Sequence, residues 1–195
     1  MKYFLVGTCV LFVMSWSWAA VAYDEAHLKK LKLLGNCPSC DLTDADLFAA
    51  NLKGANLSKA TLWGANLSNA YLNGANLLNA FLRDANLTEA SLIQVDLTEA
   101  HLAQADLSWA NMNGANLLDA VLVDANLTGA RLLNATLGRA NLSGANLSGS
   151  NLSNATLWEA NLSDANLSGA NLSNATLSEA NLSNVNLSGA NLSNA

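Results

Sequence analysis

The strongest constraint on this fold is a leucine at every fifth position. Leucine occupies position 42 and each fifth position from there to 192, with Met112 as the one substitution. Alanine stands two residues before nearly every one of these leucines, replaced by Cys40, Val95, Ser150 and Val185. The residue directly before the leucine is mostly Asn or Asp. A period this regular indicates a repeat architecture.

A five-residue period fits neither an α-helix nor a flat strand. At about 100° per residue, five helical steps turn each leucine by ~140° around the axis, so no apolar stripe forms. In a strand the side chains alternate between faces, so an odd repeat would send successive leucines to opposite sides. All the leucines can be buried only if the chain bends after each repeat and winds around them. The leucine and the small residue two before it then point inward, and Asn, Asp, Ser and Gly suit the bends.

Longer spacings in the sequence predict how many repeats close one turn. The tetrapeptide Asn-Ala-Thr-Leu occurs at 134–137, 154–157 and 174–177, and the segments 154–173 and 174–193 differ at three positions only. A spacing of twenty residues predicts four repeats per coil, each forming one side of a square. Stacked coils would lie about 4.8 Å apart, the distance between paired strands.

The repeat itself resembles a known family. The pattern in Ala55-Asn56-Leu57 and Ala105-Asp106-Leu107, followed by two variable residues, is similar to that of the pentapeptide repeat family. The resemblance covers residues 35–195 and implies an all-β fold, a right-handed quadrilateral β-helix. At four repeats per coil, this range predicts a solenoid of about eight coils. The handedness is implied by the resemblance alone.

The first residues have the composition of an export signal. In residues 1–22, Lys2 supplies a positive charge, Tyr3 to Trp18 form an apolar run, and Ala20-Val21-Ala22 is a typical cleavage site. We expect a secretory signal peptide, with a mature protein that begins at Tyr23 and does not stably insert into a membrane. The alternative is an uncleaved membrane anchor, because the run approaches the about 20 residues that span a bilayer. Export predicts the periplasm, the thylakoid lumen or the extracellular space.

Residues 23–34 interrupt the repeat. Leu28, Leu31 and Leu34 recur at three-residue spacing between lysines, and Gly35-Asn36 is a helix stop. We predict an amphipathic helix that covers the open apolar end of the β-helix. The competing interpretation is a basic helix that lies on a membrane surface. The open last coil is a sheet edge, which can fray or pair end to end with a second copy to form a homodimer.

Two cysteines fall in register with the repeat. Gly35-Asn36-Cys37-Pro38-Ser39 is a degenerate repeat, so Cys37 and Cys40 both point inward at the first coil. In an exported protein the pair is expected to form a disulfide. The alternatives are two buried thiols, a redox pair or a metal site. The Leu-Leu…Cys-x-x-Cys-Asp-Leu lead-in is similar to that of exported cyanobacterial pentapeptide repeat proteins.

One side of the predicted coil carries large residues. Before its leucines stand Thr61, Phe81, His101 and Val121, and after them stand Trp63, Arg83, Ala103 and Val123. Contiguous apolar groups, together with aromatic rings and arginine, are typical of interfaces. The candidate protein-interaction face therefore consists of the following residues: Trp63, Phe81, Arg83, His101, Val121 and Val123. The alternative is that large residues simply cover the strand here.

The other outward positions predict less. The opposite side carries a weaker patch with Tyr71 and Ile93, whereas Trp109 and Trp158 look isolated. An Asn or Asp column at every twentieth position from 46 to 186 predicts side-chain amide ladders between coils. The surface beyond Asn141 is nearly all Asn, Ser, Gly and Asp and is typical of a hydrated spacer.

Composition and motifs exclude several functions. The formal net charge of −6 argues against a nucleic-acid-binding surface. No phosphate loop, metal-ligand cluster or catalytic constellation is visible, so we expect no enzyme, cofactor or metal site. Some cytosolic members of the resembled family mimic DNA and protect or inhibit DNA gyrase, which is the alternative function here. The leader and the scattered carboxylates oppose it, because DNA carries a charge per ~1.7 Å of axis. The favoured function is an exported, non-catalytic rod that scaffolds or binds another protein.

Overall fold

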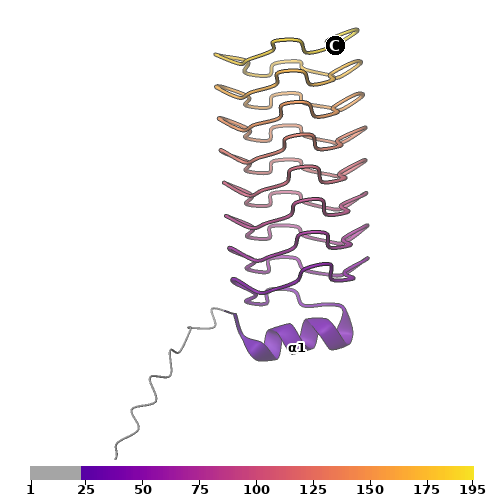
Figure 1. The fold of residues 1–195 in the computed structure, drawn as a ribbon, viewed down its shortest axis with the longest axis vertical. Helices are drawn as coiled ribbons and strands as arrows, with labels where there is room; N and C mark the ends of the chain where they lie inside the picture. The colour runs from indigo at the N-terminus through magenta and orange to yellow at the C-terminus, as the bar shows by residue number, and fades with distance from the viewer. Residues whose placement is uncertain (1–22) are drawn as a thin grey trace, which may run out of the picture.

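The computed structural model describes residues 23–195, and the predicted signal peptide at 1–22 lies outside the described residues. The chain forms one helix, α1 (Glu25–Leu34), followed by a stack of flat coils that ends at the C-terminus. Figure 1 shows α1 lying across the N-terminal end of this stack. No described segment forms a strand longer than one residue.

The ends of α1 are set by its capping residues. Asp24 is the N-cap, and its side chain accepts hydrogen bonds from the backbone N–H groups of Ala26 and His27. Gly35 ends the helix with a φ of 67°, a left-handed conformation that favours glycine. Leu31 is buried against the coil, but Leu34 is 67% exposed. The expected contribution of Leu34 to the buried face is therefore wrong, because the chain turns away from the helix directly after it.

The coils are joined by parallel bridges between residues twenty positions apart. They run from Asp41–Thr61 to Asn171–Asn191 and recur every five residues. At each bridge two backbone hydrogen bonds form: for example, Leu62 N–H donates to Phe81 O at 2.7 Å, and Phe81 N–H donates to Ala60 O at 2.9 Å. Four five-residue repeats therefore separate each residue from the one stacked on it, which is the spacing that the sequence predicted.

A tight turn closes each repeat. The N–H of the inward alanine donates to the carbonyl of the preceding leucine, as in Ala65 to Leu62 at 3.1 Å. The second residue after each leucine has a positive φ of 51–70°, which Asn, Asp and Gly adopt most readily. Residues that rarely have a positive φ, such as Glu89 and Trp109, also have one here. The same turn therefore forms in every repeat, whichever residue occupies this position. Turns thus leave only one residue per side for bridging.

The interior is a continuous column of leucine and alanine. Leucines from 42 to 172 and Met112 are at most 5% exposed, and Cys37 and Cys40 close the column at the N-terminal end. Ser150 replaces an inward alanine, and its hydroxyl donates to Leu147 O at 2.7 Å, so the buried polar group is satisfied. In the last coil the core is open, and Leu182 is 37% exposed.

The predicted amide ladder is present over part of its column, at 46–66, 106–126, 146–166 and 166–186. Asn66 Nδ2 donates to Asp46 Oδ1 at 3.1 Å, and Asn186 Nδ2 donates to Asn166 Oδ1 at 3.1 Å. Equivalent bonds join Asn141 to Asn161 and Asn151 to Asn171 on other sides of the coil, where no ladder was predicted. Most of these side chains also accept the backbone N–H two residues on, so each holds its own turn as well as the next coil.

The buried leucine column generates a first prediction. Leu127→Ala should lower the free energy of unfolding by about 2–5 kcal/mol, because it leaves a cavity between two complete coils. Leu182→Ala, in the open last coil, removes the same atoms from a site that is 37% exposed and should cost less. Urea unfolding followed by far-UV circular dichroism measures both. If both variants lost the same free energy of unfolding, the close packing described for the central coils would be contradicted.

The turn column generates a second prediction. A Cβ atom on Gly129 would lie 2.5 Å from the indole ring of Trp109, whereas one on Gly149 would meet nothing within 4 Å. The two glycines have similar φ values, 65° and 64°, so both alanine substitutions carry the same backbone strain. Gly129→Ala should therefore destabilise by about 1–3 kcal/mol more than Gly149→Ala in the same urea assay. If the two variants had the same urea midpoint, the contact between Gly129 and the Trp109 ring would be disproved.

Candidate interaction surface

Residues 23–195 contain neither a cluster of metal-ligating side chains nor a long apolar helix. Within residues 23–195 no group of three or more His, Cys, Asp or Glu side chains is placed to hold a metal ion. No helix in the same range is long and apolar enough to span a bilayer. The features that distinguish one part of the rod from another are therefore its outward side chains.

The first column of the candidate face is built by the bridges. Thr61, Phe81, His101 and Val121 are each bridged to the next and so lie one above another. The rings of Phe81 and His101 are stacked, with centroids 5.0 Å apart and an interplanar angle of 14°. The neighbours of Phe81, Ala80 and Leu82, are both hydrogen-bonded to the backbone of His101 in the next coil. The backbone ladder therefore sets this stacking distance.

The second column lies beside the first. The Trp63 ring packs edge to face against Phe81, with centroids 6.4 Å apart and an interplanar angle of 86°. Arg83 follows Trp63 in this column, and its guanidinium is held by Asp84 Oδ2 at 3.3 Å and Gln104 Oε1 at 2.9 Å. A shallow cavity of about 260 Å³ opens between Trp63, Arg83 and Asp84. The structure thus joins aromatic rings and an oriented cation on one surface.

The six predicted face residues are not equally accessible. Trp63 is 50% and Phe81 36% exposed, and Arg83 and His101 are exposed as well. Val121 and Val123 are only partly exposed. The accessible part of the face therefore lies between Trp63 and His101, in the N-terminal half of the rod. We call these four residues, Trp63, Phe81, Arg83 and His101, the aromatic face.

The weaker patch on the opposite side is narrower than the aromatic face. Tyr71 is 49% exposed, and the ammonium of Lys53 lies 5.7 Å from its ring centroid. Ser91 donates to Asn73 Oδ1 at 2.7 Å, and the same oxygen accepts the N–H of Ile93 at 3.1 Å. The column around Tyr71 is thus largely polar and internally bonded.

Trp158 is not isolated, so that prediction is wrong. Arg139 Cζ lies 4.9 Å from the Trp158 ring centroid, within the range of a cation–π contact. The guanidinium also binds Asp119, with Nε at 2.6 Å from Oδ1 and Nη2 in contact with Oδ2. Trp158 leans over Gly138, where a Cβ atom would lie 2.4 Å from the indole. The twenty-residue spacing of 119 and 139, and of 138 and 158, is the signal that could have found this cluster.

The ion pair between Arg139 and Asp119 shifts the pKa of both residues. The hydrogen bond from Arg139 lowers the pKa of Asp119; burial opposes this shift, and the charge of Arg139 adds a further lowering. The pKa of Arg139 is raised by the same bond. Because the folded-state pKa of Asp119 is depressed, the contribution of the pair is present above the ordinary aspartate pKa and is lost as the pH falls through the folded value. The two side chains are 31% and 44% exposed, so this contribution is small.

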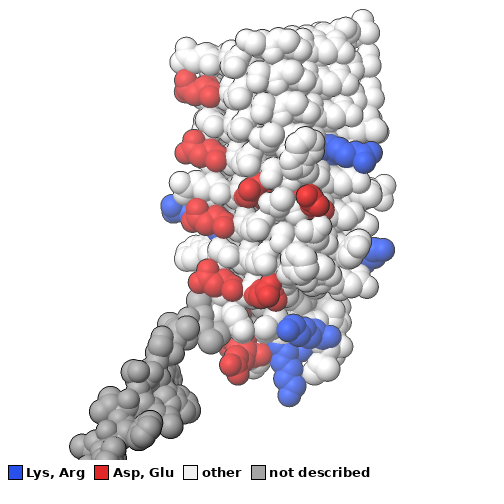
Figure 2. Space-filling view, viewed as in Figure 1, with Lys and Arg blue, Asp and Glu red and all other residues white. Residues whose placement is uncertain are grey.

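Acidic groups recur along another column. Asp44, Asp84, Asp124 and Asp164 occupy the second position after the leucine on the side of the aromatic face, at every second coil. Figure 2 shows acidic groups at regular intervals along the left edge of the rod. Gly64 and Gly144 lie between them, and a Cβ atom on either would lie 2.2 Å from the Asp44 or Asp124 carboxylate. Gln104 lies between Asp84 and Asp124, so the carboxylates of this column alternate with uncharged residues and are widely spaced.

Three of the solved structures that are similar to this chain illustrate the comparison with known proteins. HetL, a pentapeptide repeat protein involved in heterocyst differentiation regulation from Nostoc sp. strain PCC 7120, is 36% identical, with 82% of this chain and 79% of HetL covered and a TM-score of 0.48. The Arabidopsis thaliana thylakoid lumen pentapeptide repeat protein AT2G44920 is 29% identical, with 62% of this chain and 68% of AT2G44920 covered and a TM-score of 0.21. Trypsin-treated QnrB1, a plasmid-mediated fluoroquinolone resistance protein, is 20% identical, with 82% of this chain and 88% of QnrB1 covered and a TM-score of 0.42.

None of the curated proteins compared with the chain matches it. The family model described as pentapeptide repeats matches in eight copies, at residues 36–64, 65–104, 100–139, 120–159 and 160–195. These segments cover nearly all of the coiled region and leave out α1, as the repeat pattern requires. Members of this family form right-handed β-helices. This chain is a member of the pentapeptide repeat family.

Proposed function

We propose that the chain is an exported, non-catalytic rod that binds a partner protein through its aromatic face. The observation that carries the proposal is the contrast along the rod. Trp63, Phe81, Arg83 and His101 present exposed rings and a cation on one side. From Asn141 onward, every residue directly before a core leucine is Asn or Thr. Aromatic residues and arginine are the side chains that most often anchor protein interfaces.

The shape of the rod supports a binding role. We infer a right-handed quadrilateral solenoid of about eight coils, which at about 4.8 Å per coil would be ~38 Å long. Both neighbours of each face residue are bonded to the adjacent coils, so the surface is fixed before a partner arrives. A pre-organised surface loses little conformational freedom on binding. The remaining coils act as a polar spacer.

Export is the second part of the proposal. It is supported by the composition of residues 1–22 and by the disulfide between Cys37 and Cys40, whose Cα atoms are 5.4 Å apart. Disulfides persist in oxidising compartments and are rare in the cytosol. The periplasm, the thylakoid lumen and the extracellular space all meet this condition.

A DNA-mimic role is less well supported. The regular carboxylates at 44, 84, 124 and 164 recur every second coil, or about 9.6 Å at strand spacing. DNA carries a negative charge every ~1.7 Å along its axis, so this column is too sparse to imitate it. We therefore favour a protein partner over gyrase-type recognition.

Binding through the aromatic face is tested by charge substitution. Phe81→Asp should weaken partner capture from periplasmic or lumenal extracts by roughly 30-fold or more, the effect of removing an interface anchor. The far-UV circular dichroism spectrum should not change, because Asp96 and Asp106 already occupy the equivalent position in other repeats. Tyr71→Asp is the matched control, since Tyr71 has the same repeat position and is 49% exposed on the opposite side.

The controls decide between outcomes. Loss of capture with Phe81→Asp and normal capture with Tyr71→Asp would support the proposal. Normal capture by Phe81→Asp would show that the rings only cover the coil. For export, a tagged protein found unprocessed in the cytosol after fractionation would refute the compartment and revive the gyrase alternative.

A further inference from the structure

The first coil has no coil before it, so its outward backbone donors need other acceptors. Elsewhere in the stack, the N–H before each leucine donates to a carbonyl of the preceding coil, as Thr61 N–H does to Cys40 O at 2.8 Å. In the first coil, Asp41 N–H donates to His27 Nδ1 at 3.1 Å, and Asn56 N–H donates to Asn36 Oδ1 at 2.6 Å. Two side chains thus replace the missing carbonyls.

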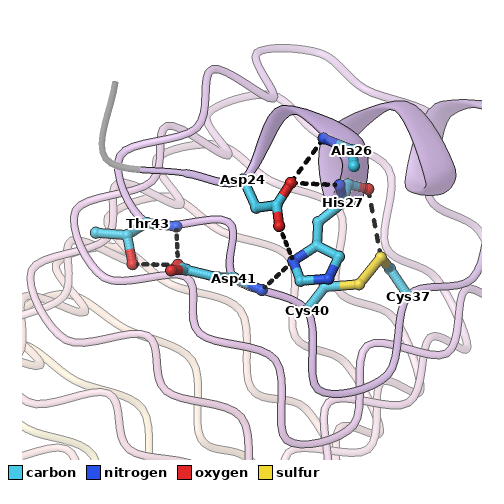
Figure 3. A network of polar contacts seen from close by, with 7 residues as sticks. All are labelled: Asp24, Ala26, His27, Cys37, Cys40, Asp41 and Thr43. Atoms are coloured by element: carbon cyan, nitrogen blue, oxygen red, sulfur yellow. Dashed lines mark hydrogen bonds and ion pairs between the residues drawn. A yellow bond between two sulfur atoms is a disulfide. The ribbon is translucent and has the colours of Figure 1, made fainter. Parts of the chain in front are cut away.

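His27 is the acceptor that joins α1 to the coil. Its imidazole projects from the first turn of α1 toward Asp41, as Figure 3 shows. At the N-cap of the helix, Asp24 Oδ2 lies 3.6 Å from Nδ1, while Asp24 Oδ1 accepts the N–H of Ala26 at 2.8 Å. A second bond between the two elements runs from Asp24 N–H to Asp41 O at 3.3 Å. Among residues 23–195 no acceptor is within reach of the Asp46 and Asn51 N–H groups.

The bond to Asp41 requires a particular form of the imidazole. A ring nitrogen can accept an N–H only while it carries no proton, so His27 must be the neutral tautomer with its proton on Nε2. A proton taken from water onto Nδ1 would turn that atom into a donor that faces the Asp41 donor. The same new N–H would be drawn to Asp24 Oδ2, which is already 3.6 Å away. Protonation therefore exchanges a contact between elements for one within α1.

We propose that His27 is a pH-sensitive attachment of the capping helix: when His27 is protonated, its bond to the first coil is lost and α1 opens from the N-terminal end. Histidine is the side chain whose charge ordinarily changes between about pH 5 and 8. The inference concerns the N-terminal end of the rod and does not depend on the aromatic face.

The other groups around His27 do not compete for the proton. From the first coil, the Asp41 carboxylate accepts from Thr43, with Oδ1 at 3.1 Å from its N and 2.7 Å from its Oγ1. From the corner at 37–40, the two cysteines form a disulfide, which does not titrate. Cys37 Sγ lies 3.3 Å from the carbonyl oxygen of His27, a van der Waals contact because a disulfide sulfur carries no hydrogen. In residues 23–195, Asp24 is thus the one carboxylate in ion-pair contact with the imidazole.

Opening of α1 would expose the disulfide. Cys37 and Cys40 are 0% and 1% exposed, and the carbonyl oxygen of His27 in α1 lies 3.3 Å from Cys37 Sγ. The N-terminal end would open locally, since the remaining coils keep all their ladder bonds. The rate at which a reductant reaches the disulfide therefore reports the state of the helix.

The test uses the full chain and tris(carboxyethyl)phosphine, a reductant active from acid to neutral pH. Reduction is followed by alkylation and mass spectrometry of the peptide that contains Cys37 and Cys40. His27→Asn is the reference, because an amide oxygen can take the place of Nδ1 and does not titrate. Between pH 7.5 and 5.0, the wild-type rate divided by the His27→Asn rate should rise roughly fivefold, the equilibrium effect of losing one hydrogen bond. His101→Asn, which removes the other histidine, should keep the acid response.

Two outcomes would overturn the proposal: parallel rates for the wild type and His27→Asn at every pH, or an acid response that disappears in His101→Asn. A second measurement on the wild type does not depend on how the variants fold. In ¹⁵N-resolved NMR, the Asp41 amide proton should move upfield with the same midpoint as the His27 imidazole titration. An Asp41 amide that stays in place while the imidazole titrates would equally reject the attachment.

Discussion

Every feature of this molecule depends on the pair of backbone hydrogen bonds that joins each coil to the next. The leucine donates to the coil after it, and the residue before the leucine donates to the coil before it. These bonds fix both neighbours of the outward side chain, so the outer surface has the regularity of the backbone. The leucine column drives the winding through apolar burial, but the ladder decides which side chains become neighbours. Rings at 81 and 101 stack because the backbone places them in line.

Much of this could be predicted from the sequence because the period is rigid. The leucine spacing alone requires a bend in each repeat, and the twenty-residue similarity of 154–173 and 174–193 predicts which residues stack. Cys37 and Cys40 could be placed inward because they fall on repeat positions. The amide ladders followed from one column of Asn and Asp. Those on the other sides were missed, although the same register argument applies to them.

Contacts that do not follow from the twenty-residue register could not be predicted from the sequence. Arg139 reaches forward to Trp158 and back to Asp119, and this direction depends on side-chain rotamers and on the space above Gly138. Likewise, the role of His27 depends on where α1 crosses the first coil, a placement that no periodicity encodes. The exposure of Leu34 has a similar origin, since it is set by the turn at Gly35. Sequence reasoning succeeded where geometry repeats and failed at the ends and in long side chains.

The near-identity of successive twenty-residue blocks beyond Asn141 has an evolutionary consequence. Inserting or deleting one such block would change the height of the solenoid by a single layer, about 4.8 Å, and leave every exposed group upstream in its place. Unequal recombination within this stretch is therefore a route by which the length of the molecule can change without altering its aromatic face.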